Sequence, residues 1–115
     1  MSSSTSVLAR LMATIEQRRA NPSPRSYTAS LLAGGVEVIG AKVLEEAAEV
    51  VDAAGGGDHP EARAHLVHEA ADLIYHLLVI LAYRQVRLGD VETELTRRFG
   101  ISGLEEKAAR GSSPE

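Results

Sequence analysis

Two groups of acidic residues in this 115-residue chain have a spacing that suits a metal site. The first is EEAAE, in which Glu45, Glu46 and Glu49 follow closely on one another, and the second is EAAD, from Glu69 to Asp72. Residues three or four apart lie on one side of a helix, so each group brings carboxylates together. Like charges placed in this way repel one another by about 0.2–0.5 kcal/mol per exposed pair, and something must offset that repulsion.

The two groups could share a metal ion if the helices that carry them run antiparallel. Glu46, Glu49, Glu69 and Asp72 would then converge, and their carboxylates would repel strongly in less watery surroundings. Mg²⁺ resolves this repulsion because it prefers oxygen ligands, and Mn²⁺ accepts the same ligands less selectively. The alternative is that each acidic group only solvates an exposed helix.

Other metal and thiol chemistry finds less support in the composition. The chain contains no cysteine, which excludes disulfides, thiolate catalysis and cysteine-ligated zinc. His65, His68 and His76 flank the second acidic group. Histidines in such positions are more often surface or core-edge groups than ligands, and the ExxH pattern of di-iron proteins is missing. We therefore expect a site made of oxygen ligands.

The acids lie in a chain that alternates helical patterns with breaker residues. Leu8, Leu11, Met12 and Ile15 have the i, i+3, i+4, i+7 spacing of an amphipathic helix, which the prolines of NPSPRS then end. Glycine runs at 34–35 and 55–57 end the next segments. We predict helical segments over about 6–20, 26–35, 36–54, 60–85, 90–98 and 102–110.

Polar residues at the starts of two of these segments should cap them. Asp58 and Glu61 have the spacing of a capping box ahead of the long helix, where Pro60 needs no N–H partner. Asp90 should cap the shorter helix that follows.

No strand pattern is present, so we predict an all-α fold in a single domain over residues 1–115. The core should span about residues 7–110, with frayed tails at 1–5 and 111–115. Hydrophobic residues make up 44% of the chain but aromatic residues only 3%, so Ala, Leu, Val and Ile must form the core. The stretch LIYHLLVILAY at 73–83 is apolar around much of its circumference and should be interior, which predicts a homo-oligomer.

The overall charge limits the classes of partner. With 12 Lys and Arg against 16 Asp and Glu, the formal charge is −4, which argues against binding to a nucleic-acid backbone. The apolar run at 73–83 is too short to span a bilayer, and the N-terminal residues lack the pattern of a secretory signal. We expect a soluble cytoplasmic protein.

Four segments together resemble one enzyme family. KVLEEAAEVVDAA at 42–54 and EAADLIYHLLVILA at 69–82 resemble the MazG-type all-α nucleotide pyrophosphohydrolases. SYTASLLAGG at 26–35 and SGLEEKAAR at 102–110 favour one branch, the phosphoribosyl-ATP pyrophosphohydrolase family of histidine biosynthesis. One departure is Leu44, where that family often has Gly.

The resemblance implies a MazG-like four-helix bundle, with antiparallel helices, that assembles as a homodimer. It implies Mg²⁺-dependent hydrolysis of phosphoribosyl-ATP between its α and β phosphates, which yields phosphoribosyl-AMP and pyrophosphate. Glu46, Glu49, Glu69 and Asp72 match the family's metal-binding acids. Either Glu45 or Glu49 would accept a proton from the attacking water.

Several residues could contact the nucleotide. Lys42 could bind phosphate, or it could form an ion pair with Glu46. Tyr27 could stack on adenine, or it could serve packing alone. Arg25 could meet a phosphate, or it could meet only water. Lys107 and Arg110 could close over the phosphates from the terminal segment, or they could only stabilise the C-terminus of that helix.

Two other functions fit the same residues. The first is a MazG-type hydrolase that removes unwanted deoxynucleoside triphosphates. The second is a helical dimerisation module without enzymatic activity, whose acids only solvate its surface.

Overall fold

The computed structural model describes residues 6–99, and within them it contains four helices and no strand. The helices are α1 (Val7–Ala20), α2 (Tyr27–Ala54), α3 (Pro60–Tyr83) and α4 (Leu88–Arg97). The predicted all-α class is therefore confirmed. The terminal segment predicted over 102–110, with Lys107 and Arg110, lies outside the described residues.

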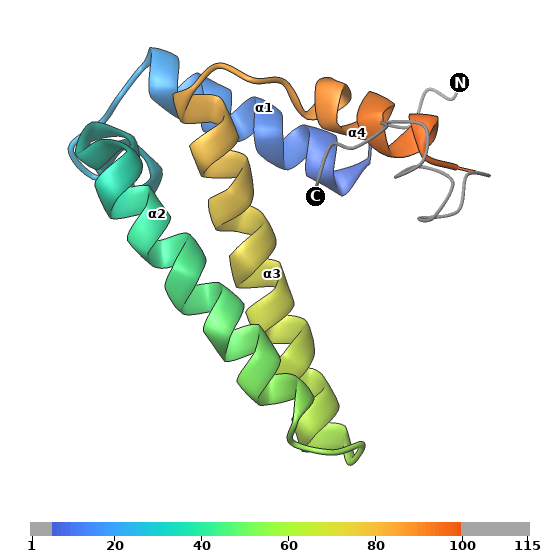
Figure 1. The fold of residues 1–115 in the computed structure, drawn as a ribbon. Coiled ribbons are helices and arrows are strands. Elements are labelled where there is room, and N and C mark those ends of the chain that lie inside the picture. Colours follow the sequence, from blue (N-terminus) through green and yellow to red (C-terminus); the bar gives the residue numbers. More distant parts are fainter. Residues whose placement is uncertain (1–5, 100–115) are drawn as a thin grey trace, which may run out of the picture.

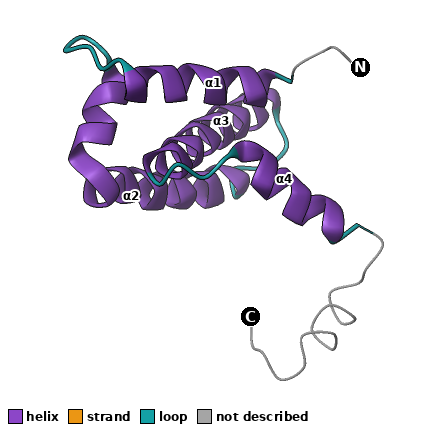
Figure 2. Cartoon of the chain, turned by 90° about the horizontal axis from the view of Figure 1, so that it is seen from above, coloured by secondary structure: helices purple, strands orange, loops and turns teal. Residues whose placement is uncertain are grey.

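The two long helices form an antiparallel hairpin, and the two shorter ones lie at one end of it (Figure 1). Helix α1 crosses that end, and α4 extends away from it, as the view from above makes clear (Figure 2). The tip of the hairpin is the glycine-rich loop after α2. This arrangement sets the acidic segments of α2 and α3 side by side along the middle of the hairpin.

Helix α2 is interrupted at Gly35, where the sequence predicted a boundary between two segments. Gly35 has φ 73° and ψ −164°, a backbone conformation that is almost restricted to glycine. A Cβ atom at this position would also lie 3.3 Å from the Tyr83 hydroxyl oxygen. The break separates a first segment of α2, residues 27–34, from the part that carries the acids.

The core lies where α1 crosses the hairpin. It consists of aliphatic side chains from three helices, namely Met12, Ile15, Leu31, Ile39, Leu78, Val79 and Ala82. Ile15, Ile39 and Val79 are almost completely buried. Burial of each such side chain stabilises the fold by about 1.5–3 kcal/mol. The predicted aliphatic composition of the core is confirmed for the described residues.

Serine caps begin the first two helices, but the cap predicted for α3 is wrong. Ser6 and Ser26 each accept a hydrogen bond from the backbone N–H three residues later, at 3.1 and 3.0 Å. At α3 the capping residue is His59, whose Nδ1 accepts from the Ala62 N–H at 3.3 Å. Pro60 occupies the first helical position, so the residue directly before it becomes the cap, and Asp58 lies one position too early.

Helix α4 begins two residues before the predicted cap. Arg87 is its N-cap and makes no side-chain capping bond, while Asp90 lies in the first turn. There the Asp90 carboxylate still favours the positive end of the helix dipole. Leu88 packs partly buried against the core and attaches the start of α4 to the rest of the fold.

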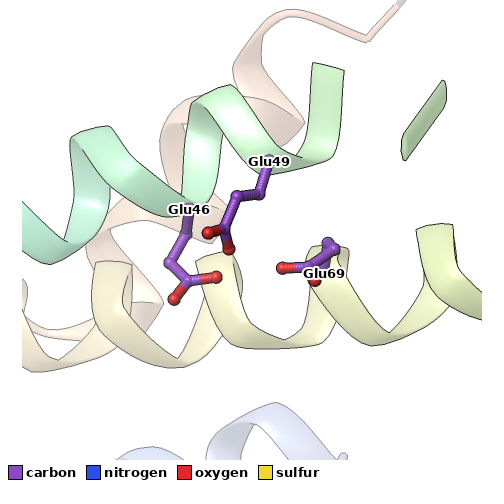
Figure 3. A group of neighbouring side chains, drawn as sticks. All are labelled: Glu46, Glu49 and Glu69. Atoms are coloured by element: carbon purple, nitrogen blue, oxygen red, sulfur yellow. The ribbon is translucent and has the colours of Figure 1, made fainter. Parts of the chain in front are cut away.

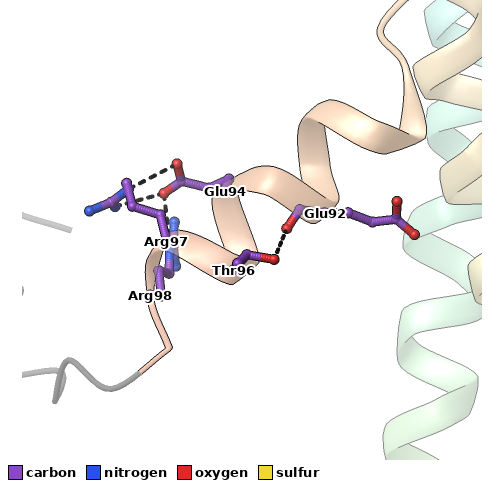
Figure 4. Close-up of polar contacts among 5 residues, drawn as sticks. All are labelled: Glu92, Glu94, Thr96, Arg97 and Arg98. Carbon is purple, nitrogen blue, oxygen red and sulfur yellow. Dashed lines mark hydrogen bonds and ion pairs between the residues drawn. The ribbon is translucent and has the colours of Figure 1, made fainter.

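Further along α4, local polar contacts support the helix (Figure 4). Glu94 accepts hydrogen bonds from Arg97 at 2.8 Å and from Arg98 at 3.0 Å. These two bonds lower the pKa of Glu94 to about 2. The Thr96 hydroxyl donates to the Glu92 carbonyl oxygen at 2.9 Å. These contacts lie within α4 and its C-cap, so they stabilise the helix without fixing its orientation.

The hairpin helices are apolar but largely exposed in a single copy. By length and composition alone α2 and α3 could each cross a membrane, with mean hydropathies of 1.2 and 1.4. Only 17% and 22% of those apolar windows are buried. The stretch at 73–83 is buried on one side, at His76, Leu78, Val79 and Ala82, and exposed on the other. Its predicted interior position is therefore only partly confirmed within one chain.

Candidate functional site

Three glutamates from the two hairpin helices meet at one point. Glu46 and Glu49 project from α2 toward Glu69 on α3, as Figure 3 shows. Each can offer one carboxylate oxygen such that these atoms all lie within 4.8 Å of one another. The antiparallel arrangement produces this convergence, because residues 46 and 69 stand at the same level of the hairpin. We call Glu46, Glu49 and Glu69 the acidic cluster.

Two oxygen atoms of the acidic cluster are buried without a partner. Glu46 is 6% exposed, and while the carboxylates are ionised the Oε1 atoms of Glu46 and Glu69 make no hydrogen bond to any described residue. The other side-chain oxygen of Glu69, Oε2, lies 3.0 Å from His65 Nε2. Burying a carboxylate oxygen without a donor or cation is costly, so such atoms need an explanation. A divalent cation would provide one, because it accepts oxygen ligands from several carboxylates at once.

The acidic cluster raises the pKa of Glu49 above its ordinary value. A proton shared with the neighbouring Glu69 carboxyl raises the pKa of Glu49 to about 7. Partial burial and the charges of Glu69, Glu46 and Glu45 act in the same direction. Without a cation, the cluster therefore retains a proton up to neutral pH. A bound cation would compete with that proton.

Asp72 does not join the acidic cluster in this structure. Its carboxylate instead lies near His68, with Oδ2 3.3 Å from Nε2, and its side chain is 41% exposed. The two residues are four apart on α3, the spacing at which helical side chains meet. Asp72 lies one turn from Glu69 toward the α1 end, so its role as a fourth ligand stays a prediction.

Lys42 and Glu45 lie beside the acidic cluster and face each other. Lys42 Nζ is 3.5 Å from Glu45 Oε1. The charge of Glu45, and then that of Tyr27, raises the pKa of Lys42 above its ordinary value. The alternative ion pair between Lys42 and Glu46 is absent because Glu46 turns inward toward α3 while Glu45 stays exposed.

Lys42 also lines an open pocket formed where the first segment of α2 lies against the second. The pocket has a volume of about 600 Å³ and is lined by Tyr27, Ser30, Leu31, Glu37, Val38, Ala41 and Lys42. Its walls are mostly apolar, with one cation and one carboxylate at their edge. We call it the Tyr27 pocket. It brings together two of the residues predicted to bind substrate.

Arg25 is not among the residues that line the Tyr27 pocket. It lines a separate polar pocket of about 390 Å³ at the junction of α1 and α2, together with Arg18 and Asn21. The contact between Arg25 and a phosphate stays a prediction.

The histidines contribute more than the sequence indicated. His65 and His68 each stand four residues before an acid of α3 and pair with it. That HxxxE and HxxxD spacing was visible in the sequence and could have predicted both pairs. His76 is buried and bonded to Tyr27, a residue far away along the chain, which no local pattern could reveal.

Comparison with known proteins gives a consistent result. A family described as phosphoribosyl-ATP pyrophosphohydrolase matches residues 8–99, which include α2, α3 and α4 in full. A protein of Dinoroseobacter shibae named phosphoribosyl-ATP pyrophosphatase is 53% identical over 105 residues, covering 91% of this chain and 99% of that protein. A protein of the same name from Cereibacter sphaeroides is 52% identical over 106 residues, covering 92% and 99%. Another, from Rhodopirellula baltica, is 48% identical over 103 residues, covering 90% and 85%.

Proposed function

Because this chain belongs to the phosphoribosyl-ATP pyrophosphohydrolase family, we propose that it hydrolyses phosphoribosyl-ATP to phosphoribosyl-AMP and pyrophosphate, the second step of histidine biosynthesis. The observation that carries the proposal is the acidic cluster, with buried and unpartnered oxygens from both hairpin helices. A pyrophosphohydrolase must bind several phosphate charges, and bare carboxylates alone would repel them.

The residues that would hold a metal ion are Glu46, Glu49 and Glu69, with Asp72 as the predicted fourth ligand. Their oxygen chemistry suits Mg²⁺, and Mn²⁺ would accept the same ligands. The metal would supply neutralisation of the polyphosphate charge and of the carboxylates around it. The buried Oε1 atoms of Glu46 and Glu69 are the specific support for this assignment, since each lacks any other partner among the described residues.

Water attacks the α phosphorus, pyrophosphate leaves, and a carboxylate accepts the proton of the water. Glu49 can take this last role only if its carboxylate is not bound to the metal. Glu45 is the alternative acceptor; it is exposed and paired with Lys42. No covalent intermediate is required, since positioning and charge stabilisation dominate phosphoryl transfer.

The nucleotide would occupy the Tyr27 pocket beside the acidic cluster. The ring of Tyr27 offers a surface for adenine, and the ammonium group of Lys42 offers a charge for phosphate. Lys107 and Arg110 stay predicted phosphate contacts from the terminal segment.

A second copy of the chain would cover exposed apolar side chains on the two hairpin helices. Four of these side chains are each two residues from an acid: Leu44, Val51, Val67 and Ile74. Residues two apart point about 160° away from each other around a helix, so on each helix these side chains lie opposite its acids. Leu44 and Val51, like Val67 and Ile74, are seven residues apart, the repeat of paired helices. We call these four residues the apolar stripe.

The apolar stripe supports a homodimer in which two hairpins form one four-helix bundle. Leu44 is 74% exposed and Val67 is 69% exposed, which is unfavourable for large apolar groups in water. Covering the stripe with a partner copy in this way is consistent with a soluble cytoplasmic enzyme rather than with helices that cross a membrane.

Direct assays separate the candidate functions. Pyrophosphate release should be measured with phosphoribosyl-ATP and with a panel of deoxynucleoside triphosphates, with and without Mg²⁺. A preference for a deoxynucleoside triphosphate would replace the pathway assignment and leave the chemistry in place. No turnover and no Mg²⁺-dependent change in stability would instead favour the dimerisation module.

Complementation supplies the test in the cell. The chain should restore growth of a histidine auxotroph that lacks this step. Asp72→Asn should fail to do so, because it removes the predicted fourth ligand, while Asp58→Asn at the hairpin tip serves as the control. Growth with Asp72→Asn would show that Asp72 is not a required ligand, and it would not contradict the proposed substrate.

A further inference from the structure

His76 lies on α3, one turn after Asp72, and its ring contacts Tyr27 of the Tyr27 pocket. It is 5% exposed, and both ring nitrogens have partners. Nδ1 lies 2.9 Å from the backbone carbonyl oxygen of Asp72, and Nε2 lies 3.2 Å from the Tyr27 hydroxyl. A carbonyl oxygen only accepts, so the proton is on Nδ1 and Nε2 accepts a hydrogen bond from the Tyr27 hydroxyl.

A second contact runs parallel to this one. Thr28 is hydrogen-bonded through its hydroxyl to the hydroxyl of Tyr75. Adjacent residues of α2, Tyr27 and Thr28, are thus bonded to adjacent residues of α3, His76 and Tyr75. The Tyr27 and Tyr75 rings also stack, with centroids 6.3 Å apart, and His76 meets Tyr75 edge-on at 4.9 Å. These contacts attach the first segment of α2 to α3.

That attachment decides where the Tyr27 ring stands. The break at Gly35 frees residues 27–34 from the direction of the rest of α2, so helix geometry alone does not set their position. The hydroxyl end of Tyr27 is held by His76, while the residue remains 53% exposed and lines the pocket shared with Lys42. A half-exposed tyrosine would otherwise have several rotamers available.

We propose that His76 is a positioning residue: its Nε2 atom holds Tyr27 as a fixed wall of the pocket for the nucleoside part of the substrate. This inference rests on the proposed function for the identity of the substrate. His76 does not touch the substrate and takes no part in bond breaking. It lowers the cost of ordering Tyr27 on binding, and so it acts on substrate affinity.

Two substitutions of His76 separate the two ring nitrogens. Glutamine reaches the position of Nε2, and its side-chain oxygen can accept from the Tyr27 hydroxyl. Asparagine is shorter and can keep only the bond to the Asp72 carbonyl. Tyr27→Phe removes the hydroxyl from the other side while keeping the ring. Steady-state kinetics with phosphoribosyl-ATP should be measured for all three variants at saturating Mg²⁺.

We expect His76→Asn and Tyr27→Phe each to raise KM about 3- to 10-fold, the effect of one hydrogen bond, with kcat changed less than about twofold. His76→Gln should retain a KM close to that of the unaltered protein. The double variant Tyr27→Phe/His76→Asn should be no worse than either single variant, because the two residues act through one bond. An unchanged KM in His76→Asn, or additive effects in the double variant, would overturn the proposal.

Hydrogen exchange supplies a readout that needs no substrate. Backbone amides of residues 27–34 should exchange faster in His76→Asn than in His76→Gln, while those of α1 should not differ. Equal exchange in the two variants would also overturn the proposal. Absence of turnover in the unaltered chain would defeat the proposed function instead, and the exchange comparison would still decide whether His76 holds this segment. If His76→Asn did not fold, Tyr27→Phe would supply both measurements.

Discussion

Glu46 on α2 and Glu69 on α3 each bury an Oε1 atom that no described residue bonds, and the two carboxylates face each other across the hairpin (Figure 3). Without a cation, packing α2 against α3 brings these negatively charged carboxylates together in a buried environment, and their repulsion destabilises the fold. The relationship therefore links stability to metal binding, and the first two predictions follow from it.

Glu46→Gln should weaken the response to Mg²⁺ while stabilising the metal-free fold. Removing one charge relieves repulsion within the acidic cluster, and it also removes a ligand. In the unaltered chain, Mg²⁺ at 100 times its dissociation constant should add about 2.7 kcal/mol to the free energy of unfolding. Thermal unfolding with EDTA and with Mg²⁺ measures both effects.

The turnover of phosphoribosyl-ATP should also fall in Glu46→Gln. Changes to groups that only support metal ligands cost about 10- to 100-fold, so loss of a ligand should exceed about 100-fold. Glu92→Gln is the matched control, since it makes the same chemical change at an exposed residue of α4 that is not part of the acidic cluster. Full activity and a full Mg²⁺ response in Glu46→Gln would remove Glu46 from the site.

The free energy of unfolding of the metal-free protein should fall as pH rises from about 4.5 to about 7. Glu49 has a pKa of about 7 in the folded state against 4.5 ordinarily, so the folded state holds a proton that the unfolded state has released. This contribution is fully present below pH 4.5 and is lost as pH rises through 7. Chemical denaturation in EDTA across that range measures the slope.

Two Glu→Gln variants isolate the contribution of Glu49 to this pH dependence. Glu49→Gln should make the slope between pH 4.5 and 7 less negative. Glu94→Gln should leave that slope unaltered, because the folded-state pKa of Glu94 is lowered to about 2 and its contribution is lost only as pH falls from 4.5 toward that value. An identical slope in the unaltered chain and in Glu49→Gln would contradict the raised pKa.

Much of this architecture could be predicted from local spacing. The helices could be predicted from the apolar i, i+3, i+4 pattern, the proline pair and the glycine runs. The spacing of the acids predicted that they gather on one side of each helix. Each of these signals acts within one or two turns of helix. The cap of α3 was also a local matter, but the fixed backbone of Pro60 shifted it from Asp58 to His59.

What could not be predicted depends on contacts between distant segments. The partner of Lys42 is Glu45 rather than Glu46, because packing against α3 turns Glu46 inward. The pair between His68 and Asp72 is local and could have been predicted from its spacing, but only the packing of α2 against α3 decides that Asp72 stays outside the acidic cluster. The bond between Tyr27 and His76 requires the break at Gly35, and no spacing rule relates residues so far apart.

Gly35→Ala should destabilise the fold by about 1–3 kcal/mol, the cost of forcing a residue with a side chain into such a conformation. At φ 73° and ψ −164°, an added Cβ would also stand 3.3 Å from the Tyr83 hydroxyl oxygen. Gly40→Ala is the control, because it lies in the same helix and a Cβ there meets nothing within 4 Å. That change should be neutral or stabilising by roughly 0.5–1 kcal/mol. Urea denaturation of both variants measures the difference, and equal effects would contradict a special role for Gly35.

Leu44→Glu should convert the proposed dimer to monomers. The apolar stripe places Leu44 on the side of α2 that faces away from the acids, where it is 74% exposed in one copy. Each copy would lose about 1.5–3 kcal/mol of apolar burial, which raises the dissociation constant at least about 100-fold over the two copies. Sedimentation velocity across a range of concentrations measures this change. Val7→Glu is the matched control, since it places the same charge on an exposed apolar residue at the start of α1 and should leave association unchanged. A dimer that persists in Leu44→Glu, or an unaltered chain that sediments as a monomer, would show that the apolar stripe is not the interface.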